Sequence, residues 1–225
     1  MVVASLGTSL LALIAPVRCS GCGQPDVALC VGCDRQLSAE SVREISSLYL
    51  GGHRIKVMSA GVYAGARRQA MLDFKNGGQR RLARALIASV SQLEPATFQP
   101  LAGPVLVVPV PPSVRGGWNR GFSPSLLLAR EVARGISNSR VAAIVVPRWS
   151  LQALLRSRFT ARSRSQRLLR SSKDYRVKPG TKPVGVIVVD DVAVTGATVR
   201  AVCQALVAAG FHCQLAVVAA DVPRP

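Results

Sequence analysis

Four short apolar runs constrain the fold of this 225-residue chain more than any other feature. They cover residues 105–108, 141–146, 184–189 and 214–219. Apart from Gln214, each run is apolar along its length rather than alternating between apolar and polar residues, which is typical of strands buried on both faces of a sheet. Helical patterns at 123–135 and 198–209 lie between the runs. The sequence therefore predicts an α/β fold with a parallel sheet flanked by helices.

Local signals support the expected helices. Ser123 and Pro124 are typical of a helix N-cap and first helical position, and Gly210 is a good residue to follow a helix end. A further helical pattern runs from about 64 to 94 and is interrupted near 76–78.

The composition favours an aliphatic core. Hydrophobic residues make up 49% of the chain and aromatic residues only 4%, so aliphatic side chains must fill the interior. This excludes a disordered chain, a coiled coil and a disulfide-stapled miniprotein.

The charge of the chain is strongly positive. Lys and Arg total 29 against 11 Asp and Glu, which gives a net charge of +18 and favours nucleic acid, phosphorylated metabolites or an anionic membrane surface as partners. Basic residues are concentrated in 156–182, where Asp174 is the single acid. This segment is either a mobile loop that binds phosphate or a solvated charged surface.

The first residues are mostly apolar, but they do not fit a membrane segment. Residues 2–17 have no basic start and are shorter than the roughly 20 residues that span a bilayer. Their leucines fall on one helical face, which favours a short amphipathic helix packed on its own domain over a signal or anchor. We expect a cytoplasmic protein with no membrane span.

Four cysteines form two closely spaced pairs. They are Cys19, Cys22, Cys30 and Cys33. Two such pairs with adjacent glycines are typical of two tight turns around one tetrahedral ion, and zinc is favoured over iron. Four thiolates leave no open coordination position, so the zinc would be structural. Two disulfides are the alternative, which a reducing compartment disfavours. Cys203 and Cys213 are expected to be small buried residues.

The run at 184–189 leads directly into Asp190 and Asp191. A short loop with Thr195 and Gly196 follows, and then a helix begins near Thr198. Ligands of open α/β sheets bind at the carboxyl ends of strands, and a helix N-terminus binds phosphate. The two carboxylates suit sugar hydroxyls, held directly or through a divalent cation. Their alternative role is to cap the helix, but two carboxylates after a buried strand are costly without a ligand.

These motifs resemble those of one protein family. The segment 186–198 is similar to the signature with which type I phosphoribosyltransferases bind phosphoribosyl pyrophosphate (PRPP). The cysteine pairs after an apolar helix (6–33), Phe-Lys-Asn-Gly-Gly (74–78), Val-Pro-Val-Pro (108–111) and Arg-Gly-Phe (120–122) occur in the order found in the ComF/GntX family. This family of phosphoribosyltransferase-like proteins is associated with competence.

The resemblance implies a fold and a domain division. The fold is a type I phosphoribosyltransferase-like parallel sheet flanked by helices, with a small zinc-ribbon-like knuckle before it. The N-terminal helix and zinc motif would occupy 1–58 and the phosphoribosyltransferase-like domain 59–225, with a basic flexible loop at about 154–182.

The resemblance also implies roles for individual residues. Asp190 and Asp191, the expected catalytic residues, would contact the ribose hydroxyls of PRPP and its Mg²⁺. PRPP would be bound further by Ala193, Val194, Thr195, Gly196, Ala197 and Thr198 around the 5-phosphate, and by Val110, Pro111, Arg115 and Arg120 near the pyrophosphate. The loop that closes over the site would carry Arg156, Arg158, Arg162 and Arg164.

Two functions follow from these features. The first is Mg²⁺-dependent transfer of a phosphoribosyl group from PRPP to an acceptor, linked to DNA uptake. The second is a non-catalytic protein that senses PRPP or binds single-stranded DNA or a partner in the competence machinery. Val194 stands where the family usually has Thr and where purine phosphoribosyltransferases often have a basic Asp, so it supplies no general base.

Overall fold

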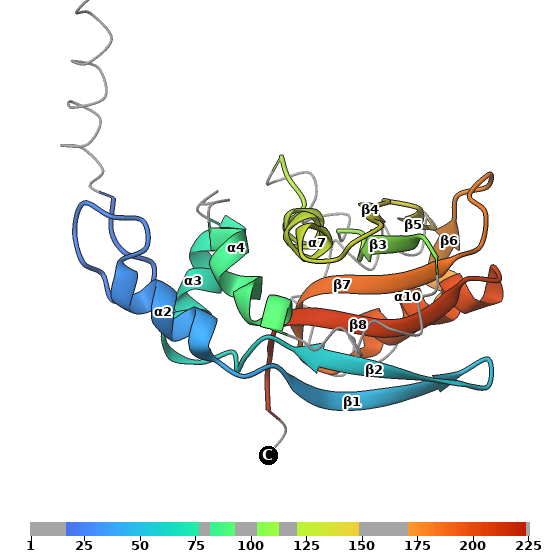
Figure 1. Ribbon diagram of the computed structural model, residues 1–225, viewed down its shortest axis with the longest axis horizontal. Coiled ribbons are helices and arrows are strands. Elements are labelled where there is room, and N and C mark those ends of the chain that lie inside the picture. The colour runs from blue at the N-terminus through green and yellow to red at the C-terminus, as the bar shows by residue number, and fades with distance from the viewer. Residues whose placement is uncertain (1–16, 77–81, 93–102, 113–120, 149–170, 224–225) are drawn as a thin grey trace, which may run out of the picture.

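A six-stranded sheet forms the centre of the molecule (Figure 1). The computed structural model describes residues 17–76, 82–92, 103–112, 121–148 and 171–223. The strand order is β1-β2-β8-β7-β3-β4. The expected helix over 6–17 lies outside the described residues, except for Val17.

The sheet is mixed but mostly parallel. Its strands are β1 (Arg43–Leu50), β2 (His53–Ser59), β3 (Val105–Pro109), β4 (Ser139–Val141), β7 (Gly185–Ala193) and β8 (His212–Asp221). Within it, β1 and β2 pair antiparallel and the other neighbours pair parallel. A separate antiparallel pair is formed by β5 (Val145–Pro147) and β6 (Tyr175–Val177).

Helices cover both faces of the sheet. The described helices are α2 (Val31–Ala39), α3 (Gly65–Asn76), α4 (Leu82–Ile87), α7 (Pro124–Arg134) and α10 (Ala197–Ala208), with short 3-10 helices η1 (Ala88–Gln92) and η2 (Ser172–Asp174). Buried residues of α2, α3, α4 and α7 share one hydrophobic cluster, and α10 belongs to the other.

The apolar runs of β3, β7 and β8 are continuous because both faces of these strands are buried. On β3, Val105 and Val107 pack in the cluster with α7, whereas Leu106 and Val108 pack in the cluster with α10. Successive side chains of a strand point to opposite faces, so a strand between two helical layers needs apolar residues at every position. The predicted α/β class is confirmed.

The predicted ends of two helices are also correct. The Oγ of Ser123 accepts a hydrogen bond from the backbone N–H of Leu126 at 3.3 Å, and Pro124 is the first residue of α7. Gly210 has φ of +85° just after α10, a conformation that glycine adopts at little cost.

The expected strand over 141–146 is not one strand. Val141 ends β4 in the main sheet, and Val145 begins β5, which pairs with β6. Part of the basic segment is also regular structure, because η2 and β6 fall within 171–177. Those residues are therefore not an irregular loop.

The expected strand over 184–189 is too short. β7 continues through Asp190 and Asp191 to Ala193, because β8 runs alongside it and pairs Ala193 with Asp221. The acids are thus part of the strand rather than residues after it.

The hairpin of β1 and β2 joins the main sheet through β8. The expected domain boundary at 58–59 therefore falls inside β2, and the division into 1–58 and 59–225 stays a prediction. None of the helices in the described parts of the chain is long and apolar enough to cross a membrane.

Candidate functional site

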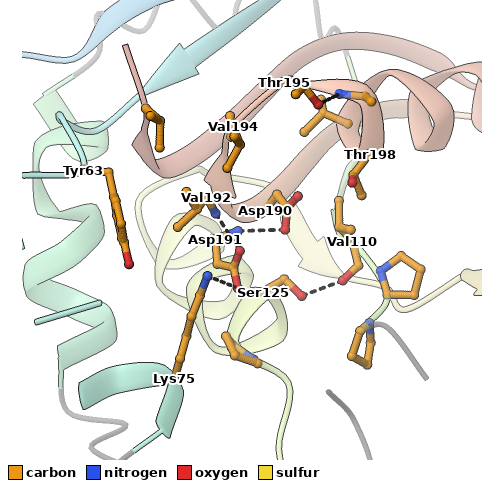
Figure 2. A pocket seen from close by; sticks show the side chains of 18 residues that line it. Tyr63, Lys75, Val110, Ser125, Asp190, Asp191, Val192, Val194, Thr195 and Thr198 are labelled. Atoms are coloured by element: carbon orange, nitrogen blue, oxygen red, sulfur yellow. Dashed lines mark hydrogen bonds and ion pairs between the residues drawn. The ribbon is translucent and has the colours of Figure 1, made fainter. Parts of the chain in front are cut away.

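A cavity of about 520 Å³ lies at the carboxyl ends of the central strands (Figure 2). Parallel neighbours end at the same edge of a sheet, so residues that follow β3, β7 and β8 meet there. The cavity is lined by Tyr63, Lys75, Val110, Pro111, Pro112, Pro124, Ser125, Asp190, Asp191, Val192, Ala193, Val194, Thr195, Gly196, Ala197, Thr198, Val199 and Val222. The structure thus brings the predicted acids and the loop at 193–198 into one site.

The two acids are held by the backbone that follows them. Oδ1 of Asp190 accepts a hydrogen bond from the N–H of Asp191 at 2.8 Å. Oδ1 of Asp191 accepts one from the N–H of Val192 at 2.6 Å. Both side chains are half-buried beside the cavity. These hydrogen bonds hold both carboxylates beside the cavity, where a bound ligand would contact them.

The loop after the acids presents a helix N-terminus to the cavity. Gly196, the N-cap of α10, has φ of +71° and has no side chain of its own that could cap the helix. Oγ1 of Thr195 accepts the N–H of Ala197 at 3.3 Å. The first backbone N–H groups of a helix and its dipole attract anions. Since 196–199 line the cavity, this wall suits a phosphate.

A second wall is built by the segment after β3 and by the start of α7. Oγ of Ser125 donates to the carbonyl of Val110 at 2.5 Å and lies 3.1 Å from Oγ of Ser123. The N–H of Val110 in turn donates to the carbonyl of Val189 at 2.8 Å. The predicted residues Val110 and Pro111 therefore line the cavity, and both backbone polar groups of Val110 are hydrogen-bonded.

Tyr63 and Lys75 are among the cavity residues that the sequence reasoning about the site missed. Tyr63 precedes α3, and Lys75 lies in its last turn. Nζ of Lys75 lies 3.0 Å from Oδ2 of Asp191 (Figure 2). The Phe-Lys-Asn-Gly-Gly segment was a signal for Lys75, but nothing in the sequence placed it beside an acid of a distant strand.

Six predicted site residues cannot be placed. They are Arg115, Arg120, Arg156, Arg158, Arg162 and Arg164, and all lie outside the described residues.

The four predicted metal ligands lie together. The sulfurs of Cys19, Cys22, Cys30 and Cys33 are all within 4.8 Å of one another. The Sγ of Cys30 accepts the N–H of Cys33 at 3.4 Å, which joins the cluster to the start of α2. A Cβ on Gly21 would lie 2.5 Å from the Sγ of Cys33, so only glycine fits there. This donor set can hold a metal such as zinc.

Electrostatics differ within the cluster. Burial raises the pKa of Cys19, but hydrogen bonds from the backbone of Cys22, Cys30 and Gly21 outweigh it and lower the value to about 6. Burial, together with hydrogen bonds to neighbouring sulfurs, raises the pKa of the Cys33 thiol to about 12. A bound cation would favour the thiolate at both positions.

Cys203 and Cys213 are buried, as predicted, and do not belong to the metal cluster. Their sulfurs are 3.3 Å apart. The hydrogen bond to Cys213, together with burial, raises the pKa of Cys203 well above the ordinary value.

Comparisons with known proteins give one informative similarity. No family model matches the chain. DNA utilization protein YhgH of Salmonella typhi is 32% identical over 133 residues, which are 57% of this chain and 54% of that protein. The chain therefore matches about half the length of this curated relative. Together with the four-cysteine cluster, this is a partial likeness to the ComF-like proteins that the sequence resembles.

Proposed function

We propose that the cavity binds PRPP with Mg²⁺ and that the protein is a phosphoribosyltransferase of the ComF type, with a type I phosphoribosyltransferase fold. The observation that carries this proposal is the shared position of two unlike groups. Asp190 and Asp191 line the same cavity as the start of α10, where the N-cap residue is a glycine. Carboxylates suit a sugar diol and its cation, and a helix start suits a phosphate, so a sugar phosphate satisfies both.

The residues of the chain have distinct roles in this proposal. The loop at 194–198 holds the 5-phosphate, and the carboxylates of Asp190 and Asp191 orient the ribose. Val110 and Pro111 face the pyrophosphate. When bound, Mg²⁺ would neutralise the pyrophosphate and assist its departure. The C1–oxygen bond to pyrophosphate breaks, a bond from C1 to a nucleophilic atom of the acceptor forms, and the acceptor's proton is released to solvent because Val194 is no base.

A second candidate function is binding of single-stranded DNA or a competence partner, with the sugar-phosphate site acting as a sensor. The name of the Salmonella typhi relative refers to DNA utilization, and the chain carries a net charge of +18. A positively charged surface binds the phosphates of a nucleic acid. We propose that the protein acts in the cytoplasm and that either activity links it to DNA uptake. In both cases the cysteine cluster would hold a structural zinc.

Calorimetric titration of PRPP with Mg²⁺ tests the first function. Wild-type protein should bind, and the double variant Asp190→Asn, Asp191→Asn should lose most of the affinity while keeping its melting temperature. The amides keep the shape of the side chains, but they remove the charge and replace one acceptor oxygen of each carboxylate with an NH₂ donor. No binding by folded, metal-loaded wild type would reject the PRPP site and leave the DNA-binding function as the better account.

Titration of single-stranded DNA at several salt concentrations tests the second function. Affinity that falls steeply with salt shows only neutralisation of phosphates. A specific DNA role requires affinity that persists after the basic segment 156–170 is neutralised. If PRPP changes this affinity, the sugar-phosphate site acts as a sensor.

A further inference from the structure

Lys75 and Asp191 form an ion pair inside the cavity, between elements far apart in the sequence. Nζ of Lys75 is 3.0 Å from Oδ2 of Asp191, and the two side chains are 20% and 22% exposed. Figure 2 shows the lysine extending from α3 toward the acid on β7. Because the pair is largely shielded from water, it is stronger than a pair on the open surface.

Because of this pair, both carboxylate oxygens of Asp191 face a hydrogen-bond donor. Oδ1 accepts the N–H of Val192 at 2.6 Å, and Oδ2 faces Lys75. A Mg²⁺ ion needs carboxylate oxygens at about 2.0–2.1 Å in near-octahedral geometry. An ammonium group 3.0 Å from the same oxygen would repel that ion. A cation can therefore use Oδ2 only if the lysine moves away.

Lys75 is well suited to such a movement. The lysine ammonium is a compact charge at the end of a flexible stem with rotatable donors. The side chain lines the same cavity as the start of α10, so a phosphorylated ligand placed there would bring negative charge near it. The ammonium could then exchange the carboxylate for the ligand, and the carboxylate would become available to the cation.

We propose that Lys75 is a positioning residue that makes cation binding depend on the phosphorylated ligand. In the empty cavity Lys75 neutralises Asp191 and competes with a divalent cation. When a sugar phosphate binds, it draws the ammonium away, and the cation takes the vacated oxygen. This inference rests on the proposed function, since it assumes that the cavity takes a sugar phosphate and a cation.

The proposal has a thermodynamic consequence. If the ligand removes a competitor of the cation, the ligand and the cation increase each other's affinity by the same factor. Replacing Lys75 with an uncharged residue should raise the affinity for the cation alone and lower the affinity for the ligand alone. A residue that merely contacted the ligand would change only the second affinity.

Mn²⁺ titration provides the test, because the electron paramagnetic resonance signal of free Mn²⁺ reports the bound fraction without requiring activity. The zinc-loaded full chain is titrated as wild type, Lys75→Met and Lys75→Arg, each with and without PRPP. Lys56→Met is the matched control, because it removes one positive charge from an exposed position on β2 that does not line the cavity. The double variant Asp190→Asn, Asp191→Asn identifies binding at the acids.

We expect Lys75→Met to bind Mn²⁺ about tenfold more tightly than wild type without PRPP, in the range typical of coupled sites. PRPP should then add little to its Mn²⁺ affinity, whereas it should strengthen Mn²⁺ binding to wild type, Lys75→Arg and Lys56→Met. If the Mn²⁺ affinity of folded Lys75→Met is unchanged or weaker, the proposal is wrong. It is also wrong if Lys75→Met and Lys56→Met raise the Mn²⁺ affinity equally. Absence of Mn²⁺ binding at the acids in every variant overturns it as well.

The same series separates this proposal from the proposed function. If PRPP does not bind to wild type, the proposed function fails. Tighter Mn²⁺ binding by Lys75→Met in the absence of PRPP would still support the competition between lysine and cation. If PRPP binds but Lys75→Met leaves the Mn²⁺ affinity unchanged, the function stands and the role of Lys75 is wrong.

Discussion

Arg67 and Glu40 form an ion pair that joins the cysteine-containing segment to the core. Nε of Arg67 donates to Oε2 of Glu40 at 3.0 Å, and the arginine side chain is only 1% exposed. The guanidinium also donates to three backbone carbonyls. They belong to Leu37 on α2, Leu86 on α4 and Ala219 on β8. Burial lowers the pKa of Arg67, and the charge of Glu40 opposes this effect. The buried positive charge therefore depends on Glu40 and on the carbonyls for its stabilisation.

Arg67→Met should therefore destabilise the protein strongly. The change leaves three buried carbonyls and one carboxylate without their donor, and loss of one partner of a buried pair costs roughly 3–5 kcal/mol. Urea unfolding followed by circular dichroism gives the free energy of unfolding. Arg134→Met is the control, because Arg134 is 70% exposed and should contribute no more than about 0.5 kcal/mol. Equal effects of the two substitutions would contradict the role given to Arg67.

Gly61 lies close against this ion pair. A Cβ there would lie 1.9 Å from Oε2 of Glu40 and 2.3 Å from Nε of Arg67. Gly61→Ala should lower the free energy of unfolding by about 1–3 kcal/mol, as overpacking does. Gly52→Ala makes no contact within 4 Å and tests only the cost of a positive φ. Urea unfolding that finds Gly61→Ala as stable as wild type would show that the pair moves freely.

Metal binding should depend on the four-cysteine cluster and on pH. Cys30→Ser should abolish stoichiometric zinc and lower the melting temperature, whereas Cys203→Ala should retain the metal. Because the pKa of Cys33 is about 12, zinc binding near neutral pH must release its proton. Zinc affinity should therefore rise as the pH rises. Competition with a chromogenic chelator between pH 6 and pH 8 measures it, and pH-independent affinity would contradict metal binding through the thiols of the cluster.

The buried thiols should react differently from those of the cluster. Cys203 and Cys213 are 0% and 2% exposed, and the raised pKa of Cys203 keeps it protonated at pH 8. Iodoacetamide should modify Cys22, which is exposed, once the metal is removed. It should reach Cys203 only when the protein opens. Mass spectrometry of the native, metal-free protein gives the order of modification. Modification of Cys203 as early as Cys22 would contradict the packing of α10 on β8.

Local signals predicted the parts of the structure that depend on neighbours in sequence. The cap at Ser123, the glycine after α10 and the spacing within the two cysteine pairs reflect contacts or conformations within a few residues. The apolar runs were readable because burial on both faces is recorded at every position of a strand. The sequence also placed the acids beside the loop at 193–198, because Asp190 through Thr198 are continuous in the chain, and these residues line one cavity.

The features that were predicted wrongly or missed depend on contacts between residues far apart in the sequence. β7 passes beyond Val189 because β8 continues beside it to Asp221. The run at 141–146 divides because β6 supplies a partner for Val145 outside the main sheet. Arg67 is an arginine in a helix of mixed composition, and only the positions of three distant carbonyls explain its burial. Lys75 reaches the site for a similar reason, since α3 packs near the end of β7.

The central claim is that the loop at 194–198 holds the 5-phosphate of a sugar phosphate beside Asp190 and Asp191. Phosphorus-31 nuclear magnetic resonance of PRPP, with Mg²⁺ and wild-type protein, tests it most directly, because the 5-phosphate and the two pyrophosphate phosphorus atoms give separate signals. We predict that the 5-phosphate signal shifts or broadens together with the pyrophosphate signals. Perturbation of the pyrophosphate signals alone, as expected for binding to a basic surface, or no perturbation at all, would contradict the account.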